Sequence, residues 1–174
     1  MSNKNQINIF IVEDNKVFAL ALKAGIETTF ANMSVKIQLF ETGELCMAKF
    51  KDEKPPIVIL DYHLNGTNPD AVDGIKVLDW IKKENSATNV IMLTADDKIE
   101  IAIKSFHHGA SDYVVKTETK FNKINYSLLN IFNMMEAKRE VKKYKSWLVV
   151  LFVCIGLLVG GVIALQVCHP SLLR

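Results

Sequence analysis

Three kinds of reactive side chain stand at the ends of apolar stretches in this sequence: carboxylates, a hydroxyl and an amine. They are Glu13 and Asp14, Asp61, Thr94, and Lys116. Carboxylates brought close together repel one another by on the order of 4 kcal/mol per pair at a surface-like effective dielectric. A divalent cation removes this cost, and Mg²⁺ prefers oxygen ligands. If the three acids converge, we expect Glu13, Asp14 and Asp61 to hold Mg²⁺.

The same side chains could also carry out phosphoryl transfer. Beside a metal, the Asp61 carboxylate can attack a phosphoryl donor and form an aspartyl phosphate. The Thr94 hydroxyl and the Lys116 ammonium group would then hold phosphoryl oxygens. Simpler interpretations exist, because Glu13 and Asp14 could be an acidic helix start and Asp61 a helix cap. The full set of side chains at strand ends favours the reactive interpretation.

The elements that must position these residues alternate between short apolar strands and amphipathic helices. This pattern is typical of an α/β domain with a parallel sheet. Because crossovers between parallel strands have one hand, the strand ends should gather at one edge of the sheet. We expect strands at 7–12, 35–40, 57–60, 90–93 and 113–115, and helices at about 17–26, 45–50, 73–85, 97–108 and from 118 onward.

Length, charge and cysteines narrow the class of protein. The chain has 174 residues, which leaves room for one domain and an appendage. A net charge of +2 gives no argument for nucleic-acid binding. The three cysteines lack the spacing of a disulfide framework or a zinc site. The N-terminus lacks the pattern of a secretory signal, so we expect the first domain in the cytoplasm.

The C-terminal part has a different composition. Residues 147–167 carry no charged side chain, and Gln166 is the only strongly polar one. As a helix this stretch would span about 31 Å, which matches the hydrocarbon core of a bilayer, although a buried core helix is the alternative. The basic run at 138–145 precedes it, so the N-terminal side should be cytoplasmic. Gly156 and Gly160 form a GxxxG pattern that could pair two spans.

Four segments of the sequence resemble the receiver domain of two-component response regulators. They are "IVEDN", "VILDYHL", "IMLTA" and "GASDYVVKT", within residues 5–136. The resemblance implies a flavodoxin-like (βα)5 doubly wound parallel sheet. It also implies that Asp61 receives its phosphoryl group from a histidine kinase or a histidine phosphotransfer protein. The Mg²⁺ ligands would then include the backbone carbonyl of His63.

The resemblance also implies a switch. Thr94 would move toward the phosphoryl group and Tyr113 would change rotamer with it, which alters the face formed by the fourth helix, fifth strand and fifth helix. The sequence departs from the family pattern at Asn65 and Thr117, where proline is common. It also has a longer loop, "NGTNPDAV", after the acceptor. These departures bear on loop rigidity and on the donor interface.

Together these observations predict a membrane-tethered, stand-alone receiver that signals by protein contact and is not an enzyme. We expect a receiver domain at 5–136, a basic juxtamembrane helix at 137–146, a single transmembrane helix at 147–167 in the cytoplasmic membrane, and a short non-cytoplasmic tail at 168–174. Membrane lipid is an expected partner and nucleic acid is not. A homodimer through the fifth-helix face or through Gly156 and Gly160 is a further candidate. Two alternatives stay open: a phosphatase of the haloacid dehalogenase type and a non-phosphorylated membrane adaptor.

Overall fold

The computed structural model describes residues 6–64, 72–117 and 119–168, and the side chains of 149 and 158–168 lie outside the described part. Five strands alternate with five helices in these residues, as the sequence predicts. The strands are β1 (Ile7–Val12), β2 (Val35–Phe40), β3 (Ile57–Asp61), β4 (Asn89–Thr94) and β5 (Asp112–Val115). The helices are α1 (Lys16–Thr29), α2 (Gly43–Glu53), α3 (Gly74–Glu84), α4 (Ile99–His107) and α5 (Lys120–Cys168).

The five strands form one parallel sheet in the order β2-β1-β3-β4-β5. This is the strand order of flavodoxin-like proteins, and it confirms the predicted fold class. The register pairs Val12 with Leu60, Asp61 with Leu93, and Thr94 with Val115. The carboxyl ends of β1, β3, β4 and β5 therefore lie at the same level at one edge of the sheet.

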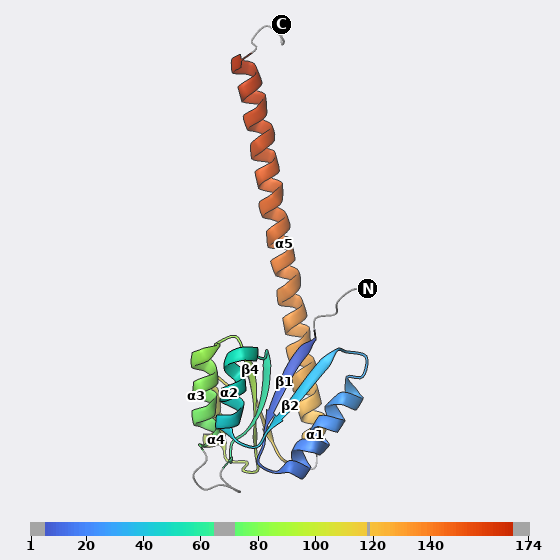
Figure 1. The fold of residues 1–174 in the computed structure, drawn as a ribbon, viewed down its shortest axis with the longest axis vertical. Coiled ribbons are helices and arrows are strands. Elements are labelled where there is room, and N and C mark those ends of the chain that lie inside the picture. The colour runs from blue at the N-terminus through green and yellow to red at the C-terminus, as the bar shows by residue number, and fades with distance from the viewer. Residues whose placement is uncertain (1–5, 65–71, 118, 169–174) are drawn as a thin grey trace. The chain divides into compact units, whose positions relative to one another are not determined.

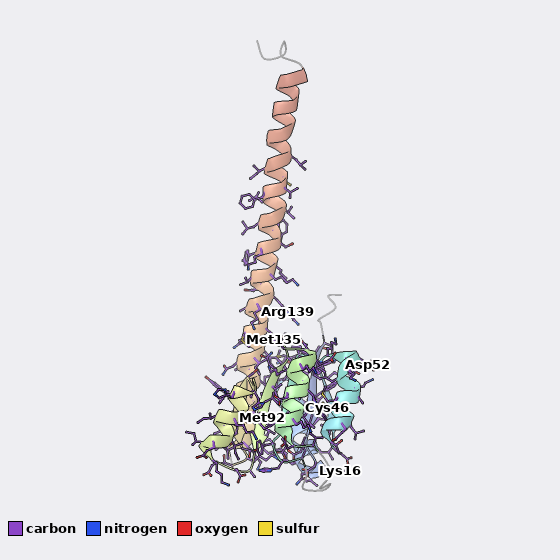
Figure 2. All side chains as sticks on the ribbon, turned by 90° about the vertical axis from the view of Figure 1, so that its left-hand side faces the viewer. Lys16, Cys46, Asp52, Met92, Met135 and Arg139 are labelled. Atoms are coloured by element: carbon purple, nitrogen blue, oxygen red, sulfur yellow. The ribbon has the colours of Figure 1, made fainter. Side chains whose placement is uncertain are left out.

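Helices cover both faces of the sheet, because successive side chains of a strand point to opposite faces. On one face, Phe10, Leu60 and Met92 pack in a core cluster with residues of α2 and α3, Cys46 and Leu78 among them. Figure 1 shows α2 and α3 side by side there and α1 on the other side of β1 and β2. Figure 2 shows Cys46 and Met92 within the body of the domain.

The other face is covered by α1 and the first turns of α5. The Phe18 ring of α1 stacks on Phe121 at 5.7 Å between centroids. The Asn125 amide donates to the Thr29 hydroxyl at 3.0 Å. The helix starts are fixed locally, since Asn15, Thr42 and Asp73 each accept a backbone N–H in the first turn. These contacts hold the loops that carry the reactive side chains.

The chain divides into two units, Met1–Leu129 and Asn130–Arg174. In the second unit, the described side chains of Tyr144, Trp147 and Phe152 are exposed, and Figure 2 shows side chains standing out around this helix. Among the described residues, no helix has the length and apolar character needed to cross a bilayer. The transmembrane helix predicted at 147–167 is therefore not supported. Within that stretch, the side chains at 149 and 158–167 lie outside the described part.

Candidate functional site

The three predicted acids converge at the carboxyl edge of the sheet. Because β1 and β3 are neighbours, the ends of these strands bring Glu13, Asp14 and Asp61 together, with one carboxylate oxygen of each within 4.8 Å of the others. Glu13 is 2% exposed and Asp61 is 3% exposed. Buried carboxylates at such distances require nearby positive charge.

Lys116 supplies part of that charge. Its Nζ atom lies 2.7 Å from Glu13 Oε2 and 2.7 Å from Asp61 Oδ2. The Lys116 side chain reaches them from the end of β5, two strands away from β3, and its ammonium group lies 4.8 Å from the centre of the Phe18 ring. Two donor bonds and a cation–π contact thus hold the amine at the acids.

The electrostatics of Glu13 show that one ammonium group does not fully compensate the cluster. Burial, and then the negative charge of Asp61, raise the pKa of Glu13 to about 7, although the bonds from Lys116 oppose this change. An additional cation would therefore be stabilised here. The donor set consists of carboxylate oxygens, which fits Mg²⁺ far better than a metal that prefers sulfur or nitrogen.

Thr94 and Tyr113 lie on the next two strands, β4 and β5. Thr94 ends β4 and is fully buried, and its hydroxyl oxygen accepts the backbone N–H of Asp96 at 3.1 Å. Tyr113 is on β5, and its hydroxyl donates to the backbone carbonyl of Asp96 at 2.9 Å. Burial raises the pKa of Tyr113 above its ordinary value.

His63 follows Asp61 by two residues. Its backbone N–H donates to Asp61 Oδ1 at 3.4 Å, and its ring Nε2 lies 3.0 Å from Asp96 Oδ2. The backbone carbonyl of His63 as a metal ligand stays a prediction.

Gly74 allows the chain to return to the end of β3 after the loop. Its N–H donates to the carbonyl of Tyr62 at 3.0 Å. A Cβ atom at this position would lie 2.2 Å from the backbone oxygen of Asp61, so no larger residue fits without moving the end of β3. The long loop predicted here lies outside the described residues except for Val72.

The structure thus brings Glu13, Asp14, Asp61 and Lys116 into one cluster, and it bonds both Thr94 and Tyr113 to the backbone of Asp96. Sequence reasoning placed Lys116 on a future phosphoryl group and missed its bonds to two acids. It also missed the contact of Phe18 with Lys116 and that of His63 with Asp96. Only the spacing of His63 and Asp96, each two residues after a reactive side chain, offered a signal for the second contact.

Comparisons with known proteins agree with this geometry. Residues 9–126 match the sequence model of the family described as "Response regulator receiver domain". "Regulatory protein AtoC" of Escherichia coli is 27% identical over 82% of this chain and 28% of its own length. "Transcriptional regulatory protein ResD" of Bacillus subtilis is 30% identical over 67% of this chain and 44% of its own. The chain therefore spans less than half of either relative.

A solved structure shares the fold. A signal receiver domain from Vibrio parahaemolyticus matches with a TM-score of 0.67 and 26% identity. The match covers 78% of this chain and 97% of that one. The likeness extends over nearly the whole of that receiver domain.

Proposed function

Because the chain belongs to the response regulator receiver domain family, we propose that its first unit accepts a phosphoryl group on Asp61 from a phosphohistidine donor. The observation that carries this proposal is the contact of Lys116 with Asp61 and Glu13, both at 2.7 Å, within a buried acidic cluster. An acceptor carboxylate needs a cation at its side to receive a group that is itself negatively charged. The donor would be a histidine kinase or a histidine phosphotransfer protein.

In this reaction an Asp61 carboxylate oxygen attacks phosphorus, the bond from phosphorus to the donor imidazole nitrogen breaks, and that nitrogen leaves with its electron pair. Glu13, Asp14 and Asp61 would hold Mg²⁺, which supplies charge neutralisation when bound. Lys116 holds one phosphoryl oxygen, and Thr94 donates its hydroxyl proton to another. Burial of Glu13 and Asp61 limits the access of water to the acyl phosphate.

Phosphate labelling tests the proposal. The full chain is incubated with Mg²⁺ and radiolabelled acetyl phosphate, and the label should be released by hydroxylamine. Asp61→Asn should abolish labelling and keep the fold, because the amide is nearly isosteric and relieves repulsion. Asp52→Asn, which removes a surface carboxylate of α2, is the matched control and should label like the parent chain. Undiminished labelling of Asp61→Asn would overturn the assignment.

We further propose that residues 147–167 tether the receiver to the cytoplasmic membrane. The proposal rests on the sequence, in which this stretch lacks charged residues and follows the basic run at 138–145. A reporter fused after Arg174 should read non-cytoplasmic and one at the N-terminus cytoplasmic. If the full chain stays in the supernatant after membranes are pelleted, the tether is wrong.

The output of the receiver is proposed to be protein contact, without turnover of a substrate. A second candidate is a receiver that controls transcription, because ResD is named a transcriptional regulatory protein. Retention of the chain on DNA would favour that candidate. Turnover of phosphorylated metabolites would favour a haloacid dehalogenase type of phosphatase, although His63 stands where that family needs a second aspartate. Signalling that survives Asp61→Asn would favour a membrane adaptor.

A further inference from the structure

The His63 side chain joins the segment after β3 to the segment after β4. Its Nε2 atom lies 3.0 Å from Asp96 Oδ2, and both side chains are partly exposed, at 47% and 39%. Because a carboxylate only accepts hydrogen bonds, the imidazole must donate through Nε2. The two joined segments each follow a reactive residue by two positions, Asp61 in one case and Thr94 in the other.

The backbone of Asp96 makes two further contacts. Its N–H donates to the Thr94 hydroxyl oxygen at 3.1 Å, and its carbonyl accepts the hydroxyl proton of Tyr113 at 2.9 Å. Asp96 therefore contacts His63 through its side chain, and Thr94 and Tyr113 through its backbone. Any movement of Asp96 changes the surroundings of both of the latter residues.

We propose that His63 is a positioning residue, which holds the Asp96 side chain and thereby fixes the backbone that orients the Thr94 hydroxyl and the Tyr113 ring. Its significance for signalling rests on the proposed function, because Thr94 and Tyr113 are the residues expected to respond to phosphorylation. The orientation of these two side chains is then preset from the acceptor segment before any phosphoryl group arrives.

A solvent-exposed ion pair with no wider consequence is the competing explanation. Such a pair contributes little to stability, so unfolding measurements cannot separate the two explanations. The position of the Tyr113 ring can separate them, because no hydrogen bond joins Tyr113 to His63 within the described part of the chain, whereas each of the two is bonded to Asp96. Because the His63–Asp96 pair is this exposed, we expect its loss to change the equilibrium between positions of the Tyr113 ring by up to about fivefold.

The test follows the Tyr113 signal by NMR in the full chain with fluorinated tyrosine, without phosphoryl donor and without Mg²⁺. Tyr113→Phe assigns the signal. His63→Ala should shift or broaden it, and His63→Gln should restore it, because a glutamine amide also donates. Asp96→Ala should reproduce the effect of His63→Ala, and the double variant should show no further change, since both substitutions break the same contact.

A matched control removes another histidine–carboxylate contact. His108 Nδ1 lies 2.6 Å from Asp79 Oδ1, between α3 and the end of α4, so His108→Ala should leave the Tyr113 signal unchanged. An unchanged Tyr113 signal in His63→Ala, or additive effects of the two single variants, would overturn the proposal. This measurement uses no phosphoryl group, so failure of phosphate labelling would refute the proposed function and leave the positioning result standing.

Discussion

Lys116 Nζ lies 2.7 Å from Asp61 Oδ2, and the same nitrogen lies 2.7 Å from Glu13 Oε2. The amine therefore joins two buried carboxylates. Removing one partner of a buried ion pair typically costs about 3–5 kcal/mol, because the other charge is left buried without compensation.

Lys116→Ala should consequently lower the free energy of unfolding by about 3 kcal/mol in EDTA, and added Mg²⁺ should recover part of the loss. Urea unfolding followed by circular dichroism measures both values. Lys120→Ala is the matched control, because Lys120 also lies over the Phe18 ring, at 5.6 Å, but is not bonded to the acids. Equal losses in the two variants would contradict the role of Lys116 as the counter-charge of the cluster.

The pKa of Glu13 predicts how stability depends on pH when no divalent metal is bound. The folded-state pKa is raised to about 7 from an ordinary value of 4.5, by burial and by Asp61, so the folded state holds a proton that the unfolded state releases. Stability should thus fall as pH rises from about 4.5 to 7. Glu13→Gln should remove this fall, on the order of 2 kcal/mol, in urea unfolding in EDTA.

The control for this pH profile is Glu27→Gln, which removes an exposed carboxylate of α1 that pairs with Lys23. It should keep the slope of the parent chain between pH 4.5 and 7. A Glu13→Gln profile parallel to that of the parent chain would show that the slope arises elsewhere.

Gly74 should tolerate no side chain. Gly74→Ala places a Cβ atom 2.2 Å from the Asp61 carbonyl oxygen and 2.8 Å from Tyr62 Cα, so backbone must move. We expect a loss of at least about 2 kcal/mol in stability and weaker Mg²⁺ binding by titration calorimetry. Gly25→Ala, in the interior of α1 with nothing within 4 Å of the new Cβ, should instead stabilise the chain by about 0.5–1 kcal/mol. Equal effects at both positions would contradict the close approach.

Thr94→Ala should separate metal binding from the response of the surface. Asp96 loses the acceptor of its backbone N–H, which costs about 1 kcal/mol of stability. The three carboxylates remain, so Mg²⁺ affinity should stay within about threefold of the parent chain, whereas the shift of α4 and β5 signals upon addition of beryllofluoride should be lost. If Thr94→Ala weakened Mg²⁺ binding as much as Asp14→Ala, the role of Thr94 in the surface response and not in metal binding would be wrong.

Much of the architecture follows from local patterns. Runs such as Ile57–Leu60, short and rich in β-branched residues, predict strands buried on both faces, and proline and glycine mark the ends of several elements. The alternation of strands and helices, with crossovers of one hand, then places Glu13, Asp61 and Lys116 at one edge. The bounds of the elements differ from the prediction: β3 extends through Asp61 and not only to residue 60, and α5 begins at Lys120 and not at 118. Such bounds are set by hydrogen bonds to neighbouring segments.

The sequence by itself determined which residue types stand at the strand ends, because hydrophobic periodicity is a local property of the chain. Tertiary structure decided how they pair. Strand order puts β1 beside β3, and Lys116 reaches both acids from the end of β5. Its two partners are distant in sequence, since Asp61 is 55 positions away and Glu13 is 103 positions away. It also decided that His63 contacts Asp96 and that Gly74 contacts the Asp61 backbone, since such contacts depend on loop paths that no periodic pattern encodes.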